Sequence, residues 1–275
     1  MKLIAQLKLL PTAEQADALR ATLEKANAAC DDVSRVAWES GAFREYALRK
    51  LVYGDLRTTY GLGAQIAQHC VAKVADAYAR DRTRQHRFRA TGSLAFDDRN
   101  LSYALPAASV SIWTLHGRQS MAFVCGERQW QLVQTRRGES DLVYRKGQWY
   151  LLATCAVEEP APGDLDDALG VDLGVANIAP DSDGEVHCGR AINTVRARHR
   201  RWRTKLQHKG TKGTRRRLKS LAGKERRFAR HVNHVIAKGI VAKAERTTRG
   251  IALEDLTGIR TRARARKPQR ATLHS

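Results

Sequence analysis

Hydrophobic and polar positions change from a strand-like to a helix-like pattern at Pro11. Residues 2–10 form a β-prone run that Pro11 ends. Thr12 and Gln15 then match a capping box, in which the two side chains satisfy free backbone N–H groups at a helix start. Apolar residues with helical spacing predict a helix that extends to about Glu39. They are Ala16, Leu19, Leu23, Ala26, Cys30, Val33 and Ala37.

The helical pattern continues and then gives way to short β-prone runs. Two further helices are predicted, at about 43–52 and after Gly63, so residues 12–82 form a helical module inserted after one strand. From 88 to 160 the β-prone runs are separated by turn signals, which favours a β-barrel or sandwich that strand 2–10 joins. The expected strands are 94–96, 101–105, 109–115, 120–124, 130–134, 141–145 and 148–157.

A third pattern follows a linker-like stretch at 159–164. Residues 168–174 form an apolar run bounded by glycine, and consecutive hairpin strands are expected up to Cys188. Basic helices are predicted over 191–247, as one helix at 191–222 with a weak point near 210–214 and a second at about 224–247. A last short strand, 250–256, precedes an Arg-rich tail at 261–275 that is expected to be flexible.

Charge is distributed very unevenly along the 275 residues. The formal net charge is +21 and the sequence pI is about 10.3. Residues 1–189 carry a net charge of −2, whereas residues 190–275 hold 27 Lys and Arg against 4 Asp and Glu. So many unbalanced positive charges repel one another unless a polyanion is present, which favours nucleic acid over a merely solvated face.

Composition also excludes several classes of protein. No apolar run approaches the roughly 18 residues of a membrane span, and the first residues are too polar for a signal peptide. The cysteines are odd in number and lack C-x-x-C spacing, so neither a disulfide framework nor a zinc site is indicated. They are Cys30, Cys70, Cys125, Cys155 and Cys188. We therefore expect a cytoplasmic protein with reduced, mostly buried thiols.

Two acidic residues suggest a site for divalent cations. Asp172 and Glu254 each lie on a short apolar run that is expected to be a buried strand, where a carboxylate is costly unless a cation meets it. Oxygen ligands suit Mg²⁺ or Mn²⁺. Phosphodiester cleavage by two such ions needs carboxylates that hold them in place. Gly170 and Gly174 would let a nucleic-acid backbone approach. Alternatively, Asp172 caps a turn and Glu254 pairs with an arginine.

The basic segment between these acids carries the candidate nucleic-acid contacts. Its cations are too dense for one helix face and would surround a phosphate backbone. They are Arg196, Arg198, Arg200, Arg201, Arg203, Lys205, Arg215, Arg216, Arg217 and Lys219. Trp202 lies among them and either stacks on a base or sugar or packs in the core, since the spacing alone favours neither.

Several motifs together resemble TnpB-type (OrfB-type) proteins of bacterial insertion sequences, the group similar to compact type V CRISPR effectors. The resemblance spans most of the chain, including Pro11–Gln15 and Gly138–Tyr144. It is strongest at Gly170–Gly174 with Asn177 and Asp183-Gly184, at His231–His234, and at Leu253–Leu256. It implies a transposon-associated, RNA-guided DNA endonuclease with a RuvC-like domain, whose partners are guide RNA and target DNA. Asp172 and Glu254 match the first two catalytic acids of that family.

The resemblance also implies the fold class: α+β and multi-domain, with a split wedge-type β-barrel, an inserted helical module and a partial RNase H-like (RuvC) α/β core with long basic helices. The expected domains are a barrel at 1–11 and 83–163, a helical recognition module at 12–82 and a nuclease domain at 164–260. The family's zinc motif and third catalytic Asp do not follow Glu254. An incomplete nuclease, or a cleavage-inactive protein that binds RNA and DNA, is therefore expected.

Overall fold

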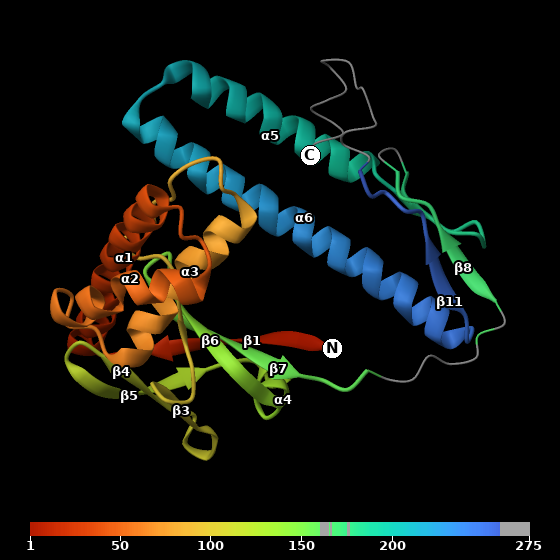
Figure 1. Cartoon of the computed structure of the whole chain (residues 1–275). Coiled ribbons are helices and arrows are strands. Elements are labelled where there is room, and N and C mark those ends of the chain that lie inside the picture. The colour runs from red at the N-terminus through yellow and green to blue at the C-terminus, as the bar shows by residue number, and fades with distance from the viewer. Residues whose placement is uncertain (160–164, 166, 175–176, 259–275) are drawn as a thin grey trace. The chain divides into compact units, whose positions relative to one another are not determined.

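The computed structural model describes residues 1–159, 165, 167–174 and 177–258, and the chain divides into two compact units, Met1–Pro160 and Ala161–Ser275 (Figure 1). The described residues form α-helices and mostly antiparallel strands, in a mixed α/β arrangement. None of the described helices combines the length and the apolar character that crossing a membrane requires.

The first unit is built on a seven-stranded antiparallel sheet. Its strands are β1 (Lys2–Leu10), β2 (Leu94–Phe96), β3 (Leu101–Ala104), β4 (Ser109–Thr114), β5 (Gly117–Val124), β6 (Arg136–Arg145) and β7 (Gln148–Ala156). The spatial order is β2-β6-β7-β1-β5-β4-β3. Tyr103 on the end strand β3 donates a hydrogen bond of 2.8 Å to Ser140 on β6, the strand next to the other end, so the sheet curls into a nearly closed barrel.

Strand β1 lies in the middle of this sheet although three helices, α1 to α3, separate it in the sequence from the other strands. It pairs with β7 along its length and with β5 at Lys8–Leu10. Side chains alternate across the strand, so Ala5, Leu7 and Leu9 are buried while their neighbours face outward. The prediction that the first strand joins the later sheet is confirmed.

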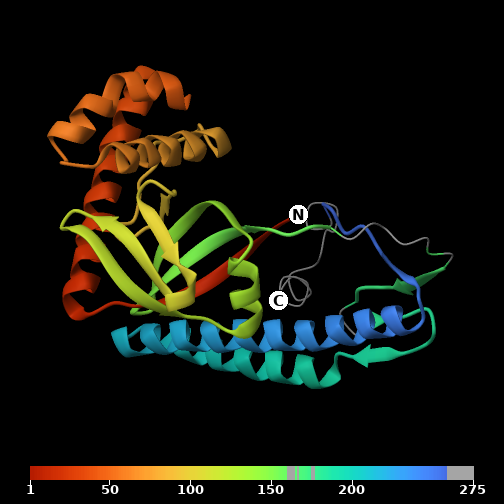
Figure 2. The same cartoon turned by 90° about the horizontal axis from the view of Figure 1, so that it is seen from below.

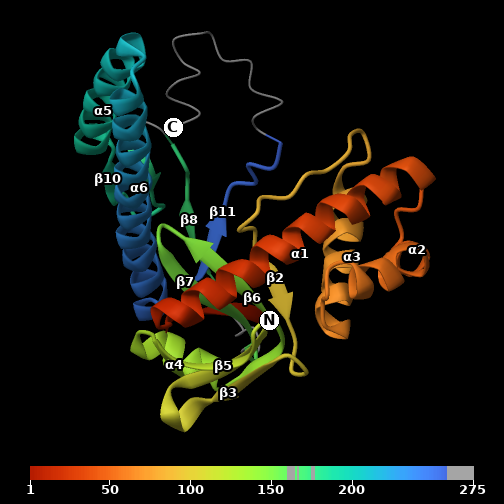
Figure 3. The ribbon, with the colours of Figure 1, turned by 90° about the vertical axis from the view of Figure 1, so that its left-hand side faces the viewer.

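Helices α1 (Ala13–Ser40), α2 (Glu45–Thr58) and α3 (Ala64–Arg80) gather on one side of the sheet (Figures 2 and 3). The capping box at the start of α1 is present: the Gln15 backbone N–H donates to Thr12 Oγ1 at 3.3 Å, and the Thr12 N–H donates to Gln15 Oε1 at 3.1 Å. Gly41 ends α1 in the left-handed region, with φ at 68°, which a side chain would strain. The second helix runs six residues further than its pattern predicted.

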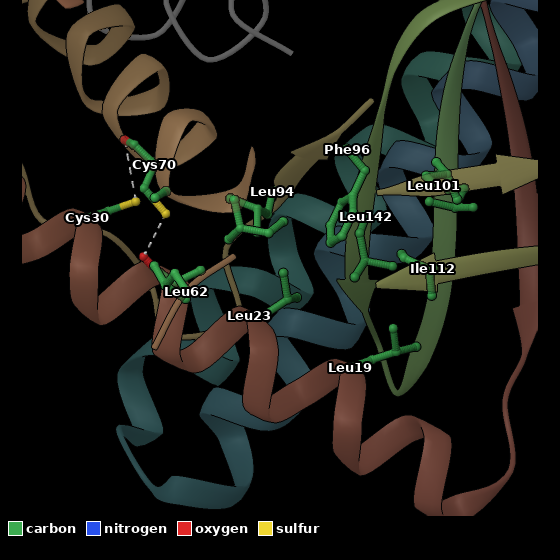
Figure 4. Close-up of a cluster of buried hydrophobic side chains, with 14 of the residues drawn as sticks. Leu19, Leu23, Cys30, Leu62, Cys70, Leu94, Phe96, Leu101, Ile112 and Leu142 are labelled. Atoms are coloured by element: carbon green, nitrogen blue, oxygen red, sulfur yellow. Dashed lines mark hydrogen bonds between the residues drawn. The ribbon is translucent and has the colours of Figure 1, made fainter. Parts of the chain in front are cut away.

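A single hydrophobic core unites the helices and the sheet of the first unit. Leu19 and Leu23 on α1 point toward Phe96, Ile112 and other strand residues (Figure 4). This core includes both the inserted helices and the barrel, so a division of residues 1–163 into separate domains stays a prediction.

The thiols that the structure describes are mostly buried, as expected. Cys30, Cys70 and Cys155 are buried and Cys125 is half-buried, and all four are free. The Cys70 thiol donates to the carbonyl of Ala26 at 3.5 Å. Its contact with Cys30 and its burial raise the pKa of Cys70, which keeps the thiol in its unreactive neutral form.

One strand prediction in this unit is wrong. Residues 130–133 belong to helix α4 (Glu127–Val133), which follows Gly126 as its N-cap residue and ends at Gln134 as its C-cap residue. The ring of Trp130 packs against Phe123 with centroids 6.0 Å apart, and Val133 on the same helix is buried. A short apolar run fits either period, and this tertiary packing selects the helix. A 3-10 turn at Leu105–Ala107 also separates β3 from β4.

The second unit combines short strands with a long helical hairpin (Figure 1). Its strands are β8 (Ala168–Val171), β9 (Asn177–Pro180), β10 (Val186–Cys188) and β11 (Gly250–Leu253). Strand β9 pairs with β10 antiparallel and β11 pairs with β8 parallel, while a bridge between Val171 and Asp181 links the two pairs. The small core contains Leu169, Val171, Ala179 and Ala244.

The boundary between the two basic helices differs from the prediction. Helix α5 spans Arg190–Lys209, and helix α6 spans Lys212–Arg246 without a break at Gly223. Gly210 separates them in the left-handed region at a φ of 62°, and Thr211 caps α6 by accepting from the Thr214 N–H at 3.2 Å. The weak point at 210–214 is therefore the hairpin turn itself.

We expect Leu23→Ala to lower the free energy of unfolding of the first unit by about 2–5 kcal/mol, because it leaves a cavity in a core where Leu23 is fully buried. Urea denaturation followed by circular dichroism measures this loss. Leu51→Ala is the matched control, since Leu51 is 52% exposed on α2 and its truncation should cost less than about 0.5 kcal/mol. Equal losses in the two variants would contradict the assignment of the core.

Candidate carboxylate site and basic hairpin

The parallel pairing of β8 and β11 brings the two candidate acids to neighbouring positions. Residues are paired from Ala168 with Gly250 through Val171 with Leu253. Asp172 and Glu254 are the next residues in this register, at the carboxyl ends of both strands. Acids that lie 82 positions apart in the sequence therefore become neighbours, because the strands run in the same direction.

Strand alternation assigns these acids to the side of the sheet that helix α6 leaves open. Leu169 and Val171 are buried against Ile236, Ile240 and Ala244 of α6. Asp172 and Glu254 follow the opposite alternation and are both exposed. The expectation of two buried strands is wrong for the second, because Ile251 and Leu253 on β11 are 40% and 60% exposed.

The backbone around Asp172 is held by the strand that follows it. The Asp172 N–H donates to the carbonyl of Pro180 at 3.1 Å, and the Gly174 N–H donates to that of Ile178 at 3.3 Å. A Cβ at Gly174 would lie 2.5 Å from the carbonyl oxygen of Asn177, so no side chain fits there. The sequence suggested that Gly174 makes room for a nucleic acid, whereas this hairpin alone requires a glycine.

A network of ion pairs, absent from the sequence predictions, fixes α6 to the β9–β10 turn. Lys243 Nζ lies 2.5 Å from Asp181 Oδ2 and 3.2 Å from Asp183 Oδ2. Arg249, next to the start of β11, donates to both Asp183 oxygens, at 2.9 and 2.5 Å. Asp181 also accepts from the N–H groups of Asp183 and Glu185, so it both stabilises the turn and pairs with a cation.

These contacts shift the titration of the paired groups. The hydrogen bond from Lys243 lowers the pKa of Asp181, and Arg249 together with Lys243 lowers the pKa of Asp183. The same carboxylates raise the pKa of Lys243 and Arg249. The side chain of Asp181 is 3% exposed, so its charge depends on Lys243. The network positions the strand that leads to Glu254.

The candidate nucleic-acid contacts lie on the α5–α6 hairpin, and nearly all are exposed. Over residues 190–246 the hairpin holds 20 Lys and Arg against two acids, Glu225 and Glu245. The exposed candidates are Arg198, Arg200, Arg201, Arg203, Lys205, Arg215, Arg216, Arg217 and Lys219, and Arg196 is half-buried. The hairpin therefore presents a dense positive surface.

A groove of about 740 Å³ runs between the two helices of the hairpin. Its lining residues are Arg196, His199, Arg200, Arg203, Ala222, Glu225, Arg226, Phe228, Ala229 and Arg230. Arg203 forms an ion pair with Glu225, whose other oxygen lies 3.6 Å from His199 Nδ1. Within the described residues Arg203 is the one candidate with an ion-pair partner, so the remaining candidates keep their charge available for phosphates.

The donor set at the carboxyl ends of β8 and β11 suits a hard divalent cation. Carboxylate oxygens are preferred ligands of Mg²⁺ and Mn²⁺. Asp255, the neighbouring acid, accepts instead from the Thr257 N–H at 2.8 Å. Hydrogen bonds from the Thr257 side chain and from this N–H lower the pKa of Asp255. Among the described residues, no group of three His, Cys, Asp or Glu is arranged to hold a metal ion.

The ion-pair network should make the second unit sensitive to pH in both directions. Lowered carboxyl pKa values stabilise the fold above about pH 4, and this contribution is lost as the pH falls further. The raised pKa of Lys243 adds stability below about pH 10.4 that is lost at higher pH. Hydrogen exchange of the amides near Ala244 measures both losses.

Lys243→Met tests which groups cause this dependence. The variant should exchange faster at about pH 7, because Asp181 keeps an unpaired and nearly inaccessible charge. Its difference from the unaltered protein should shrink as the pH falls well below about 4, through the lowered pKa of Asp181, because protonation then removes the charge of this carboxyl. Lys238→Met on the exposed surface of α6 is the matched control. A difference that stays constant from neutral to strongly acidic pH would contradict the assignment.

No protein-family model matches this chain, and no curated protein matches it either. Among solved structures, the chain is similar to one in the cryo-EM structure of the Cas12f1-sgRNA-target DNA complex, with a TM-score of 0.28 and 10% sequence identity. The match covers 95% of this chain and 75% of that chain. A TM-score this low does not establish a common fold.

Proposed function

We propose that this chain is a nucleic-acid-binding protein whose α5–α6 hairpin holds a phosphate backbone beside a RuvC-like carboxylate pair. The observation that carries the proposal is the excess of 18 positive charges on the hairpin, nearly all of them exposed. A surface with this charge density attracts polyanions strongly and releases their counterions on binding.

The distribution of the cations indicates interaction with phosphates rather than with base edges. They occur on both helices and along the groove between them, whereas sequence readout uses a few side chains inserted into one groove of a duplex. A merely solvated helix surface usually mixes both signs of charge, but this hairpin holds two acids among 57 residues. Binding should therefore depend on salt and little on sequence.

Asp172 and Glu254 support the second half of the proposal. Their in-register position would let them hold Mg²⁺ or Mn²⁺, and such an ion supplies activated water and charge stabilisation for phosphodiester hydrolysis. The chain's own contribution is to fix the two acids through β8, β11 and the Lys243 network. In the finer proposal the partners are guide RNA and target DNA, and the protein is a TnpB-type endonuclease of an insertion sequence.

A cleavage-inactive binding protein is the second candidate. Its support is that the resemblance matches two catalytic acids, Asp172 and Glu254, and that the described residues contain no group of three His, Cys, Asp or Glu arranged to hold a metal ion. Two ligands hold one ion weakly, and loss of a ligand from a two-metal site costs orders of magnitude in rate. Both candidates share the binding function of the hairpin.

Measurements of Mn²⁺ affinity test whether Asp172 and Glu254 bind a metal ion and the other acids do not. Asp172→Asn and Glu254→Gln should each weaken Mn²⁺ binding about tenfold or more, as measured by water-proton relaxation without any substrate. Asp255→Asn is the matched control and should leave the affinity within about twofold, because that carboxylate accepts a hydrogen bond from the Thr257 N–H. Equal effects of all three substitutions would indicate diffuse attraction of cations rather than a site.

The salt dependence of binding tests the role of the hairpin. Replacing Arg215, Arg216 and Arg217 together by Gln should weaken binding to all sequences alike, and should reduce the slope of log affinity against log salt by about 0.7–0.9 for each phosphate that is no longer neutralised. Filter binding between about 50 and 200 mM salt measures the slope. Arg84→Gln in the first unit is the control, since Arg84 is exposed and pairs with Asp81. An unchanged slope in the triple variant would contradict the proposal.

A further inference from the structure

A second hollow lies at the end of the hairpin where α5 turns into α6. It is separate from the groove of about 740 Å³ between the two helices (the arginine groove). It has a volume of about 560 Å³, within the usual range of ligand pockets. Its lining residues are Trp202, Lys205, Leu206, Lys209, Thr211, Gly213, Thr214 and Arg217. The residues come from the last turns of α5 and the first turns of α6, so the turn at Gly210 brings them together.

Trp202 is the unusual member of this group. Its side chain is 61% exposed, whereas Leu206, one turn further along α5, is half-buried. The structure thus decides between the two sequence interpretations, because this indole is not part of a core. An indole left in water on a rigid helix offers a flat apolar face that nothing in the unit uses.

Three cations line the same hollow as this ring. Lys205 and Lys209 follow Trp202 on the same side of α5, at intervals of three and seven residues, and Arg217 faces them from α6. None of these three has an ion-pair partner among the described residues. An aromatic platform beside unpaired cations is the combination that holds a nucleotide, since the ring stacks on the base and the cations bind the phosphates.

We propose that this hollow binds an unstacked nucleotide, which makes single-stranded nucleic acid the substrate class at this end of the hairpin. The inference rests on the proposed binding function and deepens it. In a duplex each base face is covered by its neighbours, and a side chain reaches only the base edges. A single strand exposes its base faces, so Trp202 discriminates by strandedness whereas the arginine groove, which binds phosphates, does not.

The test compares single-stranded and duplex probes on the whole chain. Fluorescein-labelled oligo(dT) and oligo(rU) of about 12 nucleotides and a mixed-sequence duplex of equal length are titrated, with anisotropy as the readout. Trp202→Ala should weaken binding of both single strands about tenfold or more and leave the duplex within about twofold. Trp202→Phe should fall between, because a smaller ring still stacks. The oligo(dT) and oligo(rU) arms distinguish DNA from RNA as the source of the nucleotide.

A control variant and a check of helix content distinguish a specific effect of Trp202 from a general loss of binding or of structure. Val235→Ala truncates another exposed apolar side chain, 56% exposed on α6, and should change neither affinity. Circular dichroism confirms that each variant keeps its helices. Equal losses on single strand and duplex, or no loss on either, would overturn the assignment of Trp202 while the hairpin still binds. Failure of the unaltered protein to bind any probe would instead refute the proposed function itself.

Discussion

The parallel pairing of β8 with β11 is the constraint on which the second unit depends. Parallel neighbours cannot be joined by a tight turn, so the chain needs a long crossover between them. Here the crossover contains the whole α5–α6 hairpin, whose last turns return to cover β8 through Ile240 and Ala244. The parallel pairing thus sets the two acids in register, and the crossover that it requires contains the basic helices.

The two units are stabilised in different ways. The first unites helices and a barrel-like sheet through one extended hydrophobic core. The second buries few apolar residues and relies on two cations, Lys243 near the end of α6 and Arg249 next to the start of β11, which bind the acids of the β9–β10 turn. Most of its positive charge lies elsewhere on the hairpin, without such partners, so the same residue types stabilise the fold at one end and remain available at the other.

Local features of the fold could be predicted from the sequence, and long-range ones could not. The capping box at Thr12 and the buried face of α1 depend on neighbours within one or two turns, so periodicity was sufficient. Residues 130–133 became a helix because Trp130 packs on Phe123, an interaction that no local pattern contains. The pairing of Asp181 with Lys243 joins residues 62 positions apart, and it was missed for the same reason.

In the candidate site, too, local features could be predicted from the sequence and long-range ones could not. The two acids could be identified by residue type and by their apolar runs, but their exposure could not, since β11 proved to be largely uncovered. The ambiguity of Trp202 had the same origin, because helical spacing does not indicate which side of a helix meets a partner. The hairpin turn at Gly210 brings Trp202 and Arg217 into the lining of one hollow, and this long-range arrangement is visible only in the structure.

The sparse burial of the hairpin has a consequence for how this protein could be redesigned. Of the 35 residues of α6, the described side chains that are buried are Thr214 and Ala244. Most positions therefore tolerate a change of side chain as long as helix propensity is kept. The hairpin is thus a scaffold whose charge pattern can be rewritten almost independently of its fold, with the residues near Lys243 as the part to leave intact.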